Sequence, residues 1–227
     1  MSFDPDTLIR DLDADGYAVR PLLDPATCRE LAALYDREGL FRKRIIMEQR
    51  AYGRGEYQYF AYPLPDTVAR LRAELYPALA RVANAWSERL KEGRVFPPTL
   101  DAYLAECHAA GQTRATPLLL RYEPGGFNCL HQDLYGDLVF PLQVVVQLSD
   151  PATDFTGGEF ILVEQRPRAQ SRAMVVTPRQ GEAVVFPVHH RPGAGARGAY
   201  RLTMRHGVSR VNAGRRQTLG IIFHDAA

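Results

Sequence analysis

Cysteine, tryptophan and lysine are scarce in this chain of 227 residues, which contains three cysteines, one tryptophan and two lysines. Cys28, Cys107 and Cys129 are scattered and odd in number, which fits reduced thiols better than a disulfide framework. No run of eighteen apolar residues exists, so we expect no transmembrane helix. The first residues show neither the basic stretch nor the apolar stretch of a signal peptide. These absences predict a cytoplasmic protein and leave its oligomeric state open.

Charge is nearly balanced over the whole chain but unevenly distributed along it, with a formal net charge of +2. Residues 161–227 hold eleven arginines and three acidic residues, a net charge of +8, whereas residues 1–160 carry a net charge of −6. A basic face attracts anions such as nucleic acid, acidic lipid or a carboxylate co-substrate. Pairing of the two halves with each other would explain the distribution equally well.

The second half of the chain consists of short apolar segments separated by glycine, proline and polar turns. Such a succession favours a sandwich or jelly roll over β-α-β units. The segments that we expect to form strands lie within residues 118–126, 140–148, 156–163, 173–176, 181–186, 206–211 and 217–223.

The first 117 residues have a different pattern, with a short strand at Gly16–Val19 and three amphipathic stretches. We expect helices from Pro25 to about Arg37, from a capping Asp66 to about Leu90 with a break or kink at Pro77, and from about Leu100 to Ala109. Neither an internal repeat nor a linker divides the chain. We therefore predict one α+β domain over residues 1–227, in which residues 1–117 form helical support and a lid around a β core at residues 118–223.

His131 and Asp133 form the most informative short motif, because a later His206 offers a third ligand and Arg216 follows ten residues on. Two imidazoles and one carboxylate are the ligand set of a non-haem Fe(II) centre with open positions. One strand supplies two of these ligands if residues i and i+2 share a face. The pair alone arises readily by chance in a chain with six histidines, and a buried ion pair between structural residues is the alternative reading.

His189 and His190 are rival third ligands. They follow an apolar strand that ends at Phe186 and precede a glycine-rich loop at residues 192–198. Neither has an arginine in a clear strand pattern ten residues on, and this difference favours His206.

With these motifs in order, the sequence resembles the Fe(II)/2-oxoglutarate-dependent dioxygenases over residues 118–223. Arg121-Tyr122-x-Pro-Gly followed by Leu130-His131-Gln132-Asp133 is similar to the AlkB-type nucleic-acid demethylases, and Gly157-Gly158-Glu159-Phe160 followed by His206 and Arg216 is more similar to the prolyl hydroxylases. A bacterial branch with this mixed pattern is presumed to act on alkylated nucleic-acid bases. The resemblance implies a double-stranded β-helix, or jelly roll, with Fe(II), 2-oxoglutarate and O2 as cofactors.

Residue by residue, the resemblance makes His131, Asp133 and His206 the metal ligands and catalytic residues. It implies that Arg216 pairs with the distal carboxylate of 2-oxoglutarate, because a guanidinium binds a carboxylate bidentately. Three further residues are implied or possible contacts of the co-substrate: Tyr122, Thr218 on the same strand face as Arg216, and Gln143.

Two features set limits to this resemblance. Leu120 stands where the AlkB-type enzymes carry an asparagine beside the co-substrate, and their arginine lies farther from the distal histidine. Gln143 lies on one face of its strand with Val145 and Gln147, and this face lines the barrel or meets solvent.

Residues 41–65 interleave five basic side chains with six aromatic ones. Such a segment would stack bases and contact phosphates of a single-stranded nucleic acid; the alternative is a lid whose aromatic side chains pack on the barrel mouth. Three functions therefore remain open: an oxygenase of alkylated bases, the same chemistry on a small molecule, fatty acid or protein side chain, and a non-catalytic sensor of metal or 2-oxoglutarate.

Overall fold

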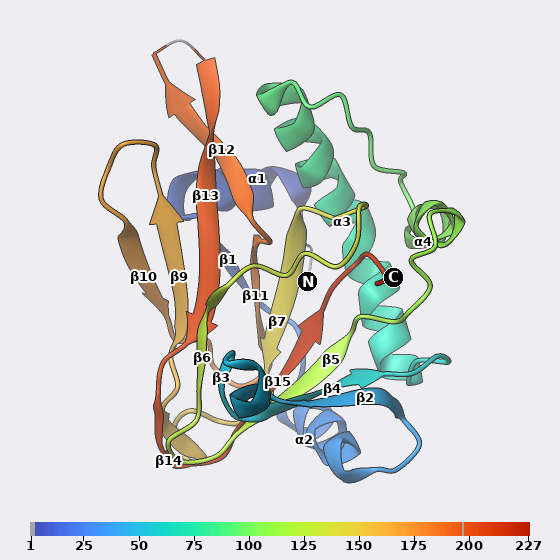
Figure 1. Ribbon diagram of the computed structural model, residues 1–227, viewed down its shortest axis with the longest axis vertical. Coiled ribbons are helices and arrows are strands. Elements are labelled where there is room, and N and C mark those ends of the chain that lie inside the picture. Colours follow the sequence, from blue (N-terminus) through green and yellow to red (C-terminus); the bar gives the residue numbers. More distant parts are fainter. Residues whose placement is uncertain (1–2, 197) are drawn as a thin grey trace.

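Two large antiparallel sheets, a separate two-stranded sheet and four helices are found in the computed structural model, which describes residues 3–196 and 198–227 (Figure 1). The helices within these residues are α1 (Pro5–Asp15), α2 (Pro25–Ala33), α3 (Asp66–Leu90) and α4 (Leu100–Ala109), with the 3-10 turns η1 (Leu34–Asp36) and η2 (Met47–Arg50). None of the described helices is long and apolar enough to cross a membrane.

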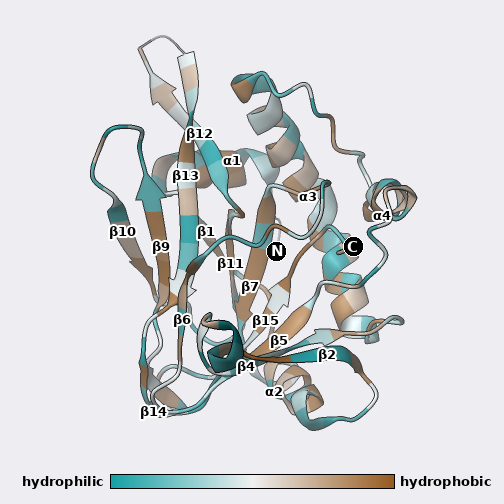
Figure 2. Cartoon of the chain, viewed as in Figure 1, coloured by the Kyte–Doolittle hydropathy of each residue, from teal (hydrophilic) through white to brown (hydrophobic). Residues whose placement is uncertain are grey.

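The larger sheet has seven strands in the order β1-β11-β7-β15-β5-β4-β2. Their bounds are Ala18–Pro21 (β1), Glu182–Pro187 (β11), Leu142–Gln147 (β7), Arg216–Ile221 (β15), Leu118–Tyr122 (β5), Glu56–Phe60 (β4) and Phe41–Ile46 (β2). Figure 2 shows that β7, in the middle of this sheet, is mainly hydrophobic. One face of the sheet packs against the helices, where Leu142, Val144 and Val146 join side chains of α1, α3 and α4 in the main core.

The smaller sheet has the order β10-β9-β13-β6-β3, and β12 pairs with β13 beside this path. Its strands are β10 (Arg172–Val176), β9 (Phe160–Gln165), β13 (Gly198–Val208), β6 (Phe127–His131), β3 (Gly53–Arg54) and β12 (His190–Gly195), and a separate pair joins β8 (Phe155–Gly157) to β14 (Val211–Gly214). Phe160, Leu162 and Met204 of this sheet pack on Val184 and Phe186 of β11. The two sheets therefore face each other, and the predicted α+β jelly roll braced by N-terminal helices is confirmed.

Local signals account for the helices. Asp4 and Asp24 each accept a hydrogen bond from the backbone N–H three residues on, and a proline follows each of them at the first helical position. The same Asp-Pro signal that predicted α2 also precedes α1, which the sequence analysis did not identify. In α3, buried side chains recur every three or four residues, as expected for an amphipathic helix on a sheet.

Two expectations for the helices need correction. Asp66 does not cap α3: Pro65 occupies that position without a side-chain hydrogen bond, and Asp66 is the first helical residue. The helix also continues through Pro77 instead of breaking there. A proline removes one backbone hydrogen bond, and burial of eleven α3 residues, including Tyr76 and Leu79 beside Pro77, holds the helix on the sheet.

Strands occur in two segments for which the sequence indicated none. Within the stretch expected to be a glycine-rich loop, residues 192–195 belong to β12, which pairs with the adjacent β13. Residues 41–65, interpreted as a substrate-contacting element or a lid, contain β2 and β4 at one side of the larger sheet and β3 at one edge of the smaller sheet. β4 and β3 pair with β5 and β6, which lie far along the sequence, and no local pattern reports such pairing.

Candidate metal centre

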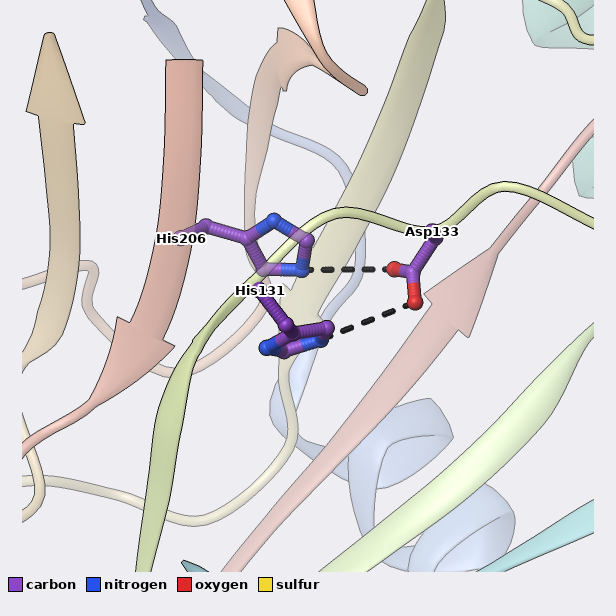
Figure 3. Close-up of side chains that lie close together, drawn as sticks. All are labelled: His131, Asp133 and His206. Carbon is purple, nitrogen blue, oxygen red and sulfur yellow. Dashed lines mark ion pairs between the residues drawn. The ribbon is translucent and has the colours of Figure 1, made fainter. Parts of the chain in front are cut away.

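His131, Asp133 and His206 meet in the space between the two sheets (Figure 3). His131 ends β6, and it lies directly opposite His206 of β13 in the pairing of the two strands. The potential ligand atoms of the three side chains all lie within 4.8 Å of one another. Oδ1 of Asp133 is 3.5 Å from Nε2 of His131, and Oδ2 is 3.3 Å from Nε2 of His206. This group is the only cluster of three or more metal-binding side chains within the described residues.

Asp133 reaches the cluster differently from the sequence prediction. Strand β6 ends at His131, so Asp133 lies in the following loop and not on the same strand face. Between them, Gln132 donates its amide N–H groups to the backbone oxygens of His189 and Met204, at 3.1 and 2.8 Å. These bonds attach the loop to the neighbouring chain, and the loop then turns the carboxylate toward the two imidazoles.

Neighbouring groups orient both imidazole rings. Nδ1 of His131 lies 2.8 Å from the backbone oxygen of Cys129. Because only a protonated Nδ1 donates to a carbonyl, this contact assigns the tautomer that leaves Nε2 free to bind a cation. The ring of His206, only 6% exposed, is packed beside Phe186 and Phe160, with ring centroids 4.8 and 6.0 Å away.

The electrostatics of the cluster favour the forms that bind a metal. Burial would raise the pKa of Asp133, but its hydrogen bond with His206 and the charges of His206 and His131 bring the pKa below its usual value. Burial and the nearby His131 lower the pKa of His206. The two shifts favour an ionised Asp133 and a neutral His206, which are the forms required for coordination.

Gln143 faces this cluster and not solvent, so the solvent-facing alternative is wrong. Its Nε2 donates to Oδ2 of Asp133 at 3.0 Å and lies 3.2 Å from Nε2 of His206. Its Oε1 is buried and has no hydrogen-bond partner among the described residues. An unpartnered buried acceptor at this position is free to contact a molecule bound beside the three ligands.

Arg216 projects from β15 of the opposite sheet and is 2% exposed. Its Nε has no hydrogen-bond partner, and no acidic group lies within 4 Å of the guanidinium in the part of the chain described. Burial lowers the pKa of Arg216 to about 10, so the side chain still carries its charge at neutral pH. A buried cation without a counter-ion is costly, and a ligand carboxylate would supply the missing partner.

The other expected co-substrate residues lie around Arg216. Tyr122 pairs with it across β5 and β15, and the guanidinium carbon is 5.7 Å from the centre of the tyrosine ring. The buried hydroxyl of Tyr122 has no hydrogen-bond partner among residues 3–196 and 198–227, and burial raises its pKa to about 12, so it stays protonated. Thr218 is buried and lines the same cavity, as does Leu120 opposite it.

A cavity of about 440 Å³ connects the three potential ligands with Arg216. The ionisable side chains in its lining, tyrosines and cysteine aside, are His131, Asp133, His206 and Arg216. The rest of the lining is apolar, aromatic or neutral polar. At the rim, Tyr52, Leu130 and Leu134 are 49%, 46% and 49% exposed.

His189 and His190 do not join the cluster. Their imidazoles contact each other, and Nε2 of His190 lies 2.8 Å from Glu92, which also binds Arg201. Burial and the neighbouring His190 lower the pKa of His189 to about 4. The geometry thus brings His206, and not either rival, to His131 and Asp133.

Part of the basic segment at residues 41–65 is engaged within the protein. Arg42 donates to the backbone oxygen of Ala115 and lies over the ring of Tyr59, while Arg44 pairs with Glu56. Arg50, next to the cavity-lining Ala51 and Tyr52, is exposed.

Sequence reasoning missed Tyr135, whose hydroxyl donates to Oδ1 of Asp133 at 2.6 Å. It also missed the individual roles of Tyr52 and Tyr57 in the lining of the cavity. Aromatic richness of residues 41–65 was the only signal for the latter two, and no motif marks Tyr135.

Comparisons with known proteins agree with this geometry. Residues 55–226 match a family model described as an oxygenase catalysing oxidative methylation of damaged DNA. The chain is 49% identical over 191 residues to an uncharacterized protein of Mycobacterium tuberculosis strain CDC 1551, with 82% of each chain covered.

Solved structures show the same fold. A Pseudomonas putida prolyl-4-hydroxylase is similar with a TM-score of 0.56 and 16% identity, over 98% of this chain and 100% of the other. A 2-oxoglutarate-Fe(II) oxygenase family oxidoreductase from Burkholderia pseudomallei is similar with a TM-score of 0.55 and 17% identity, over 100% and 94% of the two chains.

Proposed function

This chain belongs to the Fe(II)/2-oxoglutarate-dependent oxygenases, and from this premise we propose that it oxidises an alkylated base of a nucleic acid. Its cofactors are Fe(II), 2-oxoglutarate and O2. The proposal assigns Fe(II) to His131, Asp133 and His206, and the distal carboxylate of 2-oxoglutarate to Arg216. Bound together, these cofactors supply the oxidising power that places an oxygen atom on a substrate C–H bond while 2-oxoglutarate becomes succinate and CO2.

The residues present fit these cofactors. Three ligand atoms of suitable type lie within 4.8 Å of one another, and Arg216 is a buried cation without an acidic partner among the described residues. Tyr122 and Thr218 add hydroxyl groups beside Arg216, and Gln143 offers an unpartnered amide oxygen beside the metal ligands. In this proposal the chain orients the co-substrate between the two sheets, and Phe160 and Phe186 keep water from the His206 side.

The residues that line the cavity support a nucleobase as the substrate. Beyond the residues assigned to metal and co-substrate, its lining has no charged side chain. A free amino acid would bury its ammonium or carboxylate group there without a partner, which is unfavourable. An alkylated base whose ring stays neutral is flat and uncharged, and it stacks well on tyrosine rings such as those of Tyr52 and Tyr57. The matched family is itself described as acting on damaged DNA.

Oxidation of an N-methyl group would give an N-hydroxymethyl group, which releases formaldehyde and restores the base. The test is turnover of 2-oxoglutarate with a panel: a single-stranded oligonucleotide with an N-methylated base, its unmethylated twin, a fatty acid and a proline-containing peptide. We expect succinate and formaldehyde in equal amounts with the methylated oligonucleotide. Substrate-dependent succinate with the peptide or fatty acid alone would contradict the nucleic-acid proposal.

The same assay tests the metal assignment. His131→Ala, Asp133→Ala and His206→Ala should each abolish succinate formation, since three protein ligands define this type of centre. His190→Ala is the matched control, because this histidine is bound to Glu92 away from the cluster. Activity retained by His206→Ala and lost by His190→Ala would show that the third ligand is wrongly assigned.

An aliphatic substrate is the second candidate. Leu130 and Leu134 form part of an apolar rim, which would also accept an alkyl chain. The fatty-acid arm of the panel decides between the two.

A further inference from the structure

Two side chains outside the ligand set, linked by hydrogen bonds, hold the carboxylate of Asp133. The hydroxyl of Tyr135 donates to Oδ1 of Asp133 at 2.6 Å, and the hydroxyl of Tyr59 donates to the oxygen of Tyr135 at 3.0 Å. The two tyrosine rings meet edge to face, with centroids 6.1 Å apart. Tyr59 comes from β4 in the larger sheet, so this contact joins the edge of that sheet to the loop after β6.

Tyr59, the residue farther from Asp133, is also held in place. Arg42 lies over the ring of Tyr59, with its guanidinium carbon 4.7 Å from the ring centre, and donates to the backbone oxygen of Ala115 at 2.7 Å. Arg42 and Tyr59 belong to the basic and aromatic segment at residues 41–65. Both residues are therefore engaged within the protein, and Tyr59 is linked to Asp133 through Tyr135.

The backbone of Tyr135 is fixed independently of its side chain. Gln112, almost fully buried, donates to the backbone oxygens of Tyr135, Leu138 and Asp225 and accepts from the N–H of Leu138. Gly136 lies against Gln112 with a φ of +108°, where a side chain would collide with the amide. The loop that carries Tyr135 is therefore built around one buried glutamine.

We propose that Tyr135 is a positioning residue for the metal ligand Asp133, and that Tyr59 acts through it. The proposal rests on the assignment of Asp133 as a ligand. Tyr59 donates to the oxygen of Tyr135 and so leaves the proton of Tyr135 directed at Asp133. Engagement of Oδ1 fixes the rotation of the carboxylate. Oδ2 retains a lone-pair site for a cation beside its hydrogen bond from Gln143. Removal of a residue that hydrogen-bonds to a metal ligand typically lowers metal affinity or activity by about 10- to 100-fold.

Equilibrium binding of Mn(II), followed by the paramagnetic resonance of the free ion without 2-oxoglutarate or substrate, tests this inference. Tyr135→Phe should raise the Kd about 10- to 100-fold, and Tyr59→Phe should raise it less. Because Tyr59 acts through Tyr135, the double variant should bind no more weakly than Tyr135→Phe alone. Tyr103→Phe, which removes a buried hydroxyl without a hydrogen-bond partner in the described part of the chain, is the control and should bind like the wild type.

A second readout separates positioning from general stability. With Co(II) at saturation, the visible absorption of Tyr135→Phe should differ from that of the wild type and of Tyr103→Phe, since it reports the coordination of the carboxylate. A Kd within twofold of wild type and an unchanged spectrum would overturn the inference. If Tyr135→Phe does not fold, an unchanged Kd and spectrum in Tyr59→Phe overturn it.

The same measurements distinguish a wrong ligand set from a wrong role of Tyr135. If the wild type binds no Mn(II), or if His206→Ala binds as tightly as the wild type, the ligand set is wrong and the role of Tyr135 falls with it. If the wild type and His206→Ala behave as expected while Tyr135→Phe is unaffected, only the positioning role is wrong.

Discussion

At the scale of single residues, burial gives the candidate site its chemical character. Arg216 is enclosed without an acidic partner in the described chain, and His131 is held in one tautomer by the backbone of Cys129. A buried cation without a counter-ion, such as Arg216, is costly to hold in the folded protein unless it serves a ligand. The fixed tautomer of His131 leaves its Nε2 free for a cation.

Arg216 provides the sharpest test at this scale. Arg216→Ala should leave metal binding intact and weaken 2-oxoglutarate about 10- to 150-fold, because a charged hydrogen bond contributes roughly 1.5–3 kcal/mol. Titration of 2-oxoglutarate at constant metal measures this loss. Arg215→Ala is the control, since Arg215 is exposed and pairs with Glu123. Equal affinity in Arg216→Ala and the wild type would remove Arg216 from the co-substrate site.

His224 predicts a pH dependence of stability. The side chain is fully buried, and burial, followed by the charge of Arg72, lowers its pKa from 6.5 to about 4. The unfolded chain therefore binds the proton more readily than the folded one. The contribution of His224 to the free energy of unfolding is therefore intact above about pH 6.5. This contribution is lost as the pH falls toward 4, and the loss reaches up to about 3 kcal/mol.

Urea unfolding across this pH range measures the effect. His224→Asn keeps an acceptor for the backbone N–H of Phe140 and removes the titrating group. The free energy of unfolding of the variant should fall less between neutral and acid pH. An equal fall in both proteins would assign the acid sensitivity to other groups.

At the scale of elements, α3 anchors the chain that follows β15. Arg72 donates to the backbone oxygens of Ile222 and Phe223 and pairs with Asp225 at 2.9 Å, and both charged side chains are buried. Ile222 lines the cavity. The helix thus holds the end of the strand that carries Arg216 and Thr218.

Removal of the Arg72 side chain should lower the free energy of unfolding substantially. Arg72→Leu leaves the buried carboxylate of Asp225 without its main partner, and breaking a buried ion pair typically costs about 3–5 kcal/mol. Arg70→Leu on the same helix removes an exposed pair with Glu74 and should cost less than about 1 kcal/mol. Thermal unfolding of the two variants compares them. Similar melting temperatures would show that the buried pair adds little to stability.

At the scale of the whole molecule, some arginines of the basic C-terminal part pair with acidic residues of the protein itself. Arg201 pairs with Glu92 and Arg215 with Glu123, so the two halves of the chain do pair with each other in part, and attraction of an anion stays a prediction. Arg205, beside His206, and Arg50, beside the cavity rim, are exposed, and no acidic group lies within 4 Å of either in the described chain. These two arginines are available to a polyanion.

Binding of single-stranded DNA should consequently weaken with added salt. Each neutralised phosphate contributes about −0.7 to the slope of log affinity against log salt, so Arg50→Gln and Arg205→Gln should each flatten it by about 0.7. Arg81→Gln on α3 is the control and should leave the slope unchanged. Arg42 and Arg44 are poor choices for this test because internal contacts engage them. Absence of DNA binding at low salt would favour the aliphatic substrate.

Sequence alone determined the succession of short strands, the cluster of potential ligands and the shared face of Arg216 and Thr218. Alternation along strands and the spacing of a ligand motif are local properties, and they can be read without a fold. The roles of the site residues stay predictions until the variants above are measured.

Only the tertiary structure decided the position of Asp133 beyond its strand, the inward direction of Gln143 and the contact of Tyr59 with Tyr135. The two tyrosines are 76 residues apart, and Arg42 reaches Ala115 across 73 residues. Such contacts depend on which strands become neighbours in the sheets. Residues 41–65 contribute strands to both sheets for the same reason: β4 pairs with β5 and β3 pairs with β6.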